Sequence, residues 1–234
     1  SSVIDFDKDR SDRSTYKLLG GSIGFYGSTL NTRQYATKGY LEKLIAQVFT
    51  GRERFEPGNP QEGYSPSPQE RQSWLQISYM KEAYHTMGPK FTLGWMAEAL
   101  YSSKNFSENY TATMMQAGEF APTPHSKLMY NEAFRANQYV AAGIKPIYVL
   151  NDMFQFRTEF YGFTPIFPIK KNALNKAYYG KAFSRFEYMG EVSVICHLPF
   201  GAISAYVNHY SSPRREWNVG MTIGWQLFNY RFVE

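Results

Sequence analysis

Residues 215–232, with the sequence REWNVGMTIGWQLFNYRF, carry the strongest indication of the fold. Large apolar side chains alternate with small or polar ones along most of this stretch. An alternation with a period of two residues is typical of a β-strand that has one apolar face and one polar face. The apolar set consists of Trp217, Val219, Met221, Ile223, Trp225 and Leu227.

The alternating register extends further than in an ordinary strand. At about 3.3 Å per residue, residues 217–227 cover more than roughly 30 Å, whereas most strands of soluble proteins contain about 5–6 residues. A tilted strand crosses a bilayer with roughly 9–11 residues. We therefore predict that the apolar set faces lipid. The alternative is an edge strand of a large soluble sandwich.

The composition favours a membrane β-barrel over a helical membrane protein. Aromatic residues make up 18% of the 234 residues, and transmembrane barrels place aromatic girdles at both membrane interfaces. The sequence contains no apolar run long enough for a transmembrane helix, which needs roughly 18 residues or more. The chain opens with SSVIDFD and shows no signal-peptide pattern, so we take it as mature or excised.

Similar alternation recurs along the chain and predicts an all-β fold. We expect about ten strands in an antiparallel meander that forms a transmembrane β-barrel, with residues 1–15 as a linker or strand entry and residues 16–234 as the barrel domain. Short turns alternate with long loops, as in outer-membrane barrels. The expected strands include residues 16–30, 40–52, 74–85, 91–101, 110–120, 147–163, 184–198, 202–210 and the closing stretch, while 134–143 reads as a short strand or an inserted loop.

Several short motifs resemble the outer-membrane assembly and secretion transporter superfamily. LN at 30–31 followed by YATKGY at 35–40 is similar to a hairpin of that superfamily, although alanine stands where proline is usual. FRAN at 134–137 occupies the place of its inward-folded loop tip, where the arginine matches. RTEFYGFTP at 157–165 and GWQLF at 224–228 fit its last strands.

The resemblance covers most of the chain and is nearest to the C-terminal barrel of bacterial patatin-like phospholipases. It implies a bacterial outer-membrane location, contact with the lipid bilayer and with the outer-membrane assembly machinery, and an upstream lipase passenger that the barrel anchors and could translocate. A homodimer is a further possible assembly. Barrels of that superfamily have sixteen strands, so this chain is expected to be part of a longer protein or a smaller barrel that closes on itself.

The resemblance also places Arg135 at the tip of a loop inside the barrel. Residues 121–146 contain three prolines and alternate poorly, which favours an inward-folded insertion over a wall strand. A charge carried away from water needs a partner, because an unpaired charge is costly there. Glu159, two residues from Arg157 on the same strand face, is an acid at a strand centre, where a lipid-facing position is improbable. We therefore predict an interior ion pair between Arg135 and Glu159. The alternative is an ordinary loop arginine in solvent.

A second hypothesis is a soluble serine esterase. Gly20-Gly21-Ser22-Ile23-Gly24 matches the G-x-S-x-G motif, in which the serine lies on a sharp turn between a strand and a helix. The residues that follow show no helical period, and the chain lacks the Asp-Gly that a patatin hydrolase uses. We therefore predict no catalytic residue in this chain and interpret Ser22 as a small residue on the inner face of a strand.

Other site classes receive little support from the sequence. The four histidines have no metal-ligand spacing, and the single cysteine, Cys196, excludes an intrachain disulfide and a cysteine-based zinc site. The net charge of +5 is spread mostly through loops and forms no basic, aromatic groove for nucleic acid. We expect no metal and no cofactor. A third hypothesis is a self-contained small barrel that is structural or forms a narrow pore.

Overall fold

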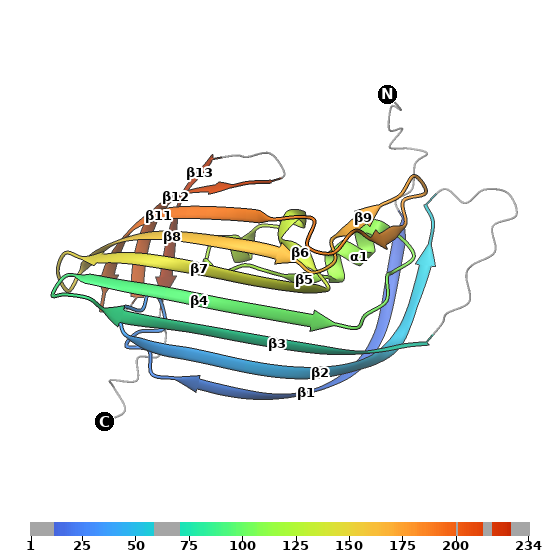
Figure 1. Ribbon diagram of the computed structural model, residues 1–234, viewed down its shortest axis with the longest axis horizontal. Helices are drawn as coiled ribbons and strands as arrows, with labels where there is room; N and C mark the ends of the chain where they lie inside the picture. Colours follow the sequence, from blue (N-terminus) through green and yellow to red (C-terminus); the bar gives the residue numbers. More distant parts are fainter. Residues whose placement is uncertain (1–11, 59–70, 200, 213–216, 226–234) are drawn as a thin grey trace, which may run out of the picture.

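The computed structural model describes residues 12–58, 71–199, 201–212 and 217–225. Its main feature is a single antiparallel sheet in which each long strand pairs with the next long strand along the chain (Figure 1). The strands, in sheet order, are β1 (Arg13–Ser28), β2 (Gly39–Glu56), β3 (Arg71–Thr86), β4 (Phe91–Ser102), β7 (Gln138–Val149), β8 (Phe154–Pro165), β11 (Glu187–Leu198), β12 (Gly201–Tyr210) and β13 (Trp217–Trp225).

The all-β meander is as predicted, with nine long strands among the described residues where about ten were expected. No pairing between β1 and β13 occurs within these residues, so the ring that would make a barrel is not seen there. None of the described helices has the length and apolar character to cross a membrane.

Two of the predicted strands are wrong. Residues 110–120 form the helix α1 (Tyr110–Gln116) and the short strand β5 (Gly118–Glu119), because the side chain of Asn109 caps the helix by accepting a hydrogen bond from the backbone N–H of Ala112. Residues 147–163 belong to β7 and β8, separated by a turn. The side chain of Asn151 stabilises this turn by accepting from the N–H groups of Met153 and Phe154.

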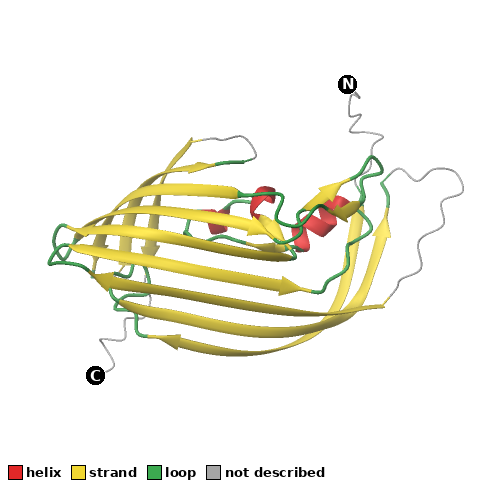
Figure 2. Ribbon diagram, viewed as in Figure 1, coloured by secondary structure: helices red, strands yellow, loops and turns green. Residues whose placement is uncertain are grey.

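The connections differ between the two ends of the sheet (Figures 1 and 2). Antiparallel order brings residues 29–38, 87–90 and 150–153 and the connection from β11 to β12 to one end, which we call the short-loop end. The opposite, long-loop end carries the connections from β2 to β3, from β4 to β7 (103–137), from β8 to β11 (166–186) and from β12 to β13. This asymmetry agrees with the predicted alternation of short turns and long loops.

The longest connection, residues 103–137, folds back onto one face of the sheet (Figure 2). We call it the insertion. Besides α1 and β5 it contains η1 (Ser126–Leu128), η2 (Glu132–Phe134) and β6 (Arg135–Ala136). The prediction that residues 121–146 form an inward-folded segment holds only as far as residue 137, because the remainder belongs to β7 in the sheet. A hairpin of β9 (Ile169–Lys171) and β10 (Ala177–Tyr179) packs beside α1.

The two faces of the sheet have opposite character. On β8, Arg157 and Glu159 are buried, whereas Phe156 and Phe160 are exposed. Residues directly opposite one another on neighbouring strands project from the same face, so the pairing registers extend this division from β1 to β13. We call the side that carries Glu159 the inner face and the side that carries Phe160 the outer face.

Candidate functional site

The inner face of β8 carries a buried ion pair. The guanidinium Nε of Arg157 lies 2.9 Å from Oε1 of Glu159, and the two side chains are 2% and 8% exposed. The hydroxyl of Tyr161 donates to the second carboxylate oxygen of Glu159 at 2.6 Å. Both oxygens of the carboxylate are therefore bonded, which is what a charge removed from water requires.

A second ion pair extends the charge cluster to neighbouring strands. Nζ of Lys145 on β7 lies 3.0 Å from Oε1 of Glu82 on β3, and the side chain of Lys145 is 5% exposed. The hydroxyl of Tyr84 donates to Glu82 and accepts from Nη2 of Arg157, so it joins the two pairs. Two cations and two carboxylates balance in charge across β3, β7 and β8.

The connection between β1 and β2 docks on this cluster. Nη1 of Arg157 donates to the carbonyl of Ala36 at 2.9 Å, and Gln155 donates to the carbonyl of Tyr35 at 3.1 Å. The hydroxyl of Tyr35 lies 2.6 Å from the Oγ of Ser204 on β12. Residues 29–38 therefore cover the inner face at the short-loop end and contact strands far from β1 and β2.

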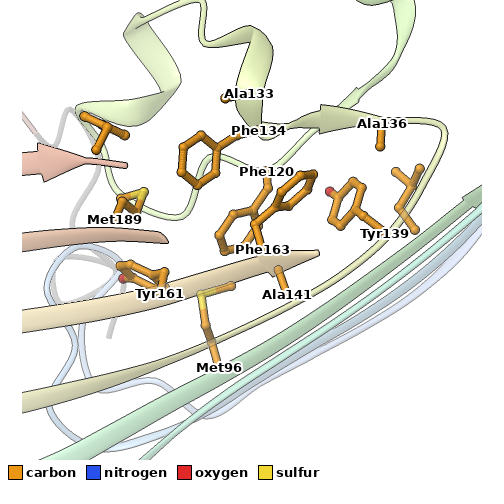
Figure 3. Close-up of a cluster of buried hydrophobic side chains, with 12 residues drawn as sticks. Met96, Phe120, Ala133, Phe134, Ala136, Tyr139, Ala141, Tyr161, Phe163 and Met189 are labelled. Carbon is orange, nitrogen blue, oxygen red and sulfur yellow. The ribbon is translucent and has the colours of Figure 1, made fainter. Parts of the chain in front are cut away.

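The insertion covers another part of the inner face with an apolar core (Figure 3). Phe120 and Phe134 are each 2% exposed and both pack against Phe163 of β8, with ring centroids 5.9 and 5.6 Å apart. Tyr139 of β7 adds a third ring at 5.0 Å from Phe163. Burial of this kind fixes the insertion to the sheet, because each large aromatic side chain contributes several kcal/mol, about 3–5 on truncation to alanine.

Arg135 organises the insertion from within. Its Nη2 lies 2.7 Å from Oε2 of Glu119, and its Nη1 donates to the carbonyls of Met115 at 3.1 Å and Ala117 at 3.2 Å. These carbonyls lie at the C-terminal end of α1, where a cation is favourable. The guanidinium also lies 4.8 Å from the ring centroid of Tyr130.

The predicted ion pair between Arg135 and Glu159 is therefore wrong. Arg135 pairs with Glu119, three residues after the end of α1, and Glu159 pairs with Arg157 on its own strand. Glu159 is buried on its face of the sheet, and its position inside a closed barrel stays a prediction. The missed partners are Glu119, Glu82 and Lys145, and the only sequence signal for Lys145 was a charged residue at an inner position of the alternating stretch 138–149.

His125 links the insertion to β12. Its Nδ1 is hydrogen-bonded to the hydroxyl of Tyr206, and its Nε2 is buried with no hydrogen-bond partner among the described residues. Burial lowers the pKa of His125 below its usual value. The ring is therefore neutral at pH 7. Its geometry is that of a packed contact, with the two rings 4.6 Å apart.

The structure does not place Ser22 on a nucleophile elbow. Ser22 lies in the middle of β1 opposite Gln47, and the strand continues to Ser28 without a turn into a helix. Gly20, Ser22 and Gly24 share the inner face, as the interpretation of small strand residues predicted. Within the described part of the chain, no group of three or more His, Cys, Asp or Glu residues could hold a metal ion.

The outer face carries the apolar register of the closing strand. Trp217, Val219, Met221 and Ile223 are each at least 62% exposed, and Thr222 projects from the opposite face. The side chain of Trp225 and the whole of Leu227 lie outside the described residues. The exposed residues continue across the sheet through Val207, Val192, Phe160 and Ile144.

No protein-family model matches the chain. A search of curated proteins also finds no significant match.

Proposed function

We propose that this chain is the membrane-embedded part of an outer-membrane β-barrel, and that it anchors an upstream passenger instead of forming an open pore. The observation that carries the proposal is the inverted sheet. Exposed apolar side chains occupy the outer face, while charged side chains are buried on the inner face. Such an outer face is favourable in contact with lipid, because exposing an apolar surface of this extent to water costs free energy.

The height of the apolar band supports this proposal. On the outer face of β2, the charged residues Glu42 and Arg52 flank Leu44, Ala46, Val48 and Thr50. Ten residue steps at about 3.3 Å give roughly 33 Å along the strand. At a tilt of about 40° this corresponds to roughly 25 Å along the membrane normal, which is the usual height of the apolar band in such barrels. The outer face of β3 repeats the pattern between Arg71 and Lys81.

Strand parity bears on how the barrel closes. An antiparallel sheet of nine strands runs its first and last strands in the same direction. Closing it with antiparallel pairs requires an odd number of further strands. An open edge in lipid is not tolerated, because the unpaired backbone groups find no water. We propose that the complete barrel contains at least one strand beyond the nine described here.

The covered inner face favours an anchor over a pore. Residues 29–38 occupy the inner face at the short-loop end, and the apolar core of the insertion occupies it between β4 and β12. An open channel would need a hydrated path past both segments. The identity of the passenger, a patatin-like lipase, rests on the sequence resemblance alone.

Lipid contact can be tested with two tryptophans on opposite faces. Trp95 projects from the outer face of β4, whereas Trp74 projects from the inner face of β3 and is 8% exposed. Single-tryptophan variants that retain one or the other are refolded into vesicles with brominated acyl chains. We expect strong fluorescence quenching of Trp95 and weak quenching of Trp74. Equal quenching, or a folded protein that stays in solution without lipid or detergent, would overturn the proposal.

A further inference from the structure

Three cations lie side by side on the outer face at the long-loop end. Lys17 of β1 is directly opposite Arg52 of β2, and Arg52 is directly opposite Arg71 of β3. All three are exposed. Among the described residues, none of the three has a carboxylate within ion-pair distance. We call Lys17, Arg52 and Arg71 the cation row.

Neighbouring charges on the same face do have partners. Nε of Arg54 lies 2.8 Å from Oε1 of Glu56, two residues further along β2. At the short-loop end of the apolar band, Glu42 is opposite Lys81, with Nζ and Oε2 3.6 Å apart, and also accepts from the hydroxyl of Tyr79. Like charges directly opposite one another destabilise a sheet. Among the described residues of β1 to β3, the cation row is therefore the end of the apolar band where like charges face one another without a carboxylate partner.

We propose that the cation row binds the headgroup of a membrane lipid that carries more than one phosphate. This inference rests on the proposed function, because it needs the band to lie in a bilayer. The row stands where the apolar positions end, which is the level of lipid phosphates. Neighbouring strands are about 4.8 Å apart, so the three cations extend over about 10 Å. A single phosphate spans only part of that width, whereas two linked phosphates match it.

Neighbouring side chains hold the guanidinium of Arg71 in an orientation that leaves it able to bind such an anion. Its Nε donates to the Oγ1 of Thr50 at 3.0 Å, and Thr50 lies 2.9 Å from the Oγ of Ser73. This contact orients the guanidinium and leaves both Nη groups to donate elsewhere. An arginine fork binds phosphate through two parallel hydrogen bonds, which makes it stronger and more specific than a lysine contact.

The experiment measures lipid retained by the refolded protein. The protein is refolded into phosphatidylcholine vesicles that contain cardiolipin, a lipid with two phosphates, or phosphatidylglycerol at equal charge density. It is then extracted in mild detergent, and bound lipid is counted by native mass spectrometry. We expect selective retention of cardiolipin. Arg52→Gln should reduce it about tenfold, the effect of losing one charge-assisted contact, and Arg71→Gln should act similarly. Arg54→Gln, whose arginine already has Glu56, should change little.

The outcomes separate the inference from the proposed function. Equal retention of cardiolipin by wild type and Arg52→Gln, or no preference over phosphatidylglycerol, overturns the lipid site. Displacement of cardiolipin by inorganic pyrophosphate at low concentration shows a site for soluble phosphates and also overturns it. Quenching of Trp95 by brominated lipid is recorded for each variant. If Trp95 is quenched while retention fails, only the lipid site is wrong, whereas an unquenched Trp95 ends the membrane proposal itself.

Discussion

The outer and inner faces of β8 have opposite character. Counted as whole residues, Phe160 on the outer face is 54% exposed, whereas its neighbour Glu159 on the inner face is 6% exposed. In a soluble sheet the two would be exchanged, because apolar side chains collect inside and carboxylates remain in water. Along this strand, alternate residues therefore meet two different surroundings, one that accepts exposed apolar side chains and one that buries paired charges. The difference indicates that the surrounding of the outer face, as much as the interior, determines which sequence this fold accepts.

The largest expected effect comes from breaking the inner face. Glu159→Ala removes the carboxylate that pairs with the buried guanidinium of Arg157, so we expect a loss of about 3–5 kcal/mol in the free energy of unfolding. Urea titration of protein folded in detergent micelles measures it. The control is Thr158→Ala on the outer face of the same strand, which should cost less than about 1 kcal/mol. Similar losses for the two variants would contradict the assignment of faces.

The next effect concerns the outer face of β13. Met221→Arg places a charge in the middle of the apolar band and should cost roughly 2–4 kcal/mol in a bilayer. Thr222→Arg, one residue along and on the inner side, should cost much less. Refolding into vesicles against a denaturant gradient compares the two. If both variants fold with equal stability, the apolar register does not face lipid.

A smaller effect is expected within the insertion. Arg135→Ala and Glu119→Ala each remove one side of an ion pair that is partly exposed, with side chains 12% and 29% accessible. A double-mutant cycle should give a coupling free energy of about 1 kcal/mol between these two residues. The matched cycle between Arg135 and Glu159 should give almost none, and a larger value there would restore the pairing expected from sequence.

The smallest expected effect is the absence of a change. Ser22→Ala should not alter hydrolysis of a p-nitrophenyl ester, because Ser22 lies mid-strand without an elbow. Ser28→Ala serves as the comparison at the end of the same strand. If the wild type hydrolyses the ester and only Ser22→Ala abolishes this activity, the anchor hypothesis is wrong and the esterase hypothesis holds.

Strands with a strict period of two could be predicted from sequence. The stretch 91–101 agrees with β4 to within one residue, and the alternating register of the closing strand begins at Trp217, as β13 does. Both could be predicted because side chains on one face of each strand share one kind of surrounding. Residues 110–120 were misassigned. Their helix depends on the cap from Asn109 and on burial against the β9–β10 hairpin, which is distant in sequence.

The candidate site was only partly predictable for a related reason. Glu159 was recognised as an inner residue because an acid at a strand centre is improbable on an apolar face. Its partner was misassigned, because the sequence resemblance favoured Arg135 over Arg157, which lies two residues away on the same face of the same strand. Glu119 became the partner of Arg135 only through the antiparallel pairing of β5 with β6.

The bond from Arg157 to the carbonyl of Ala36 joins residues 121 positions apart. Contacts of such long sequence separation form late, because the loop they close must first lose its conformational freedom. Residues 29–38 are synthesised early, but they can dock on Arg157 only after β8 has joined the sheet. Folding should therefore pass through an intermediate in which the strands are paired but residues 29–38 have not yet docked on the inner face. A variant such as Arg157→Met would prolong the lifetime of that intermediate.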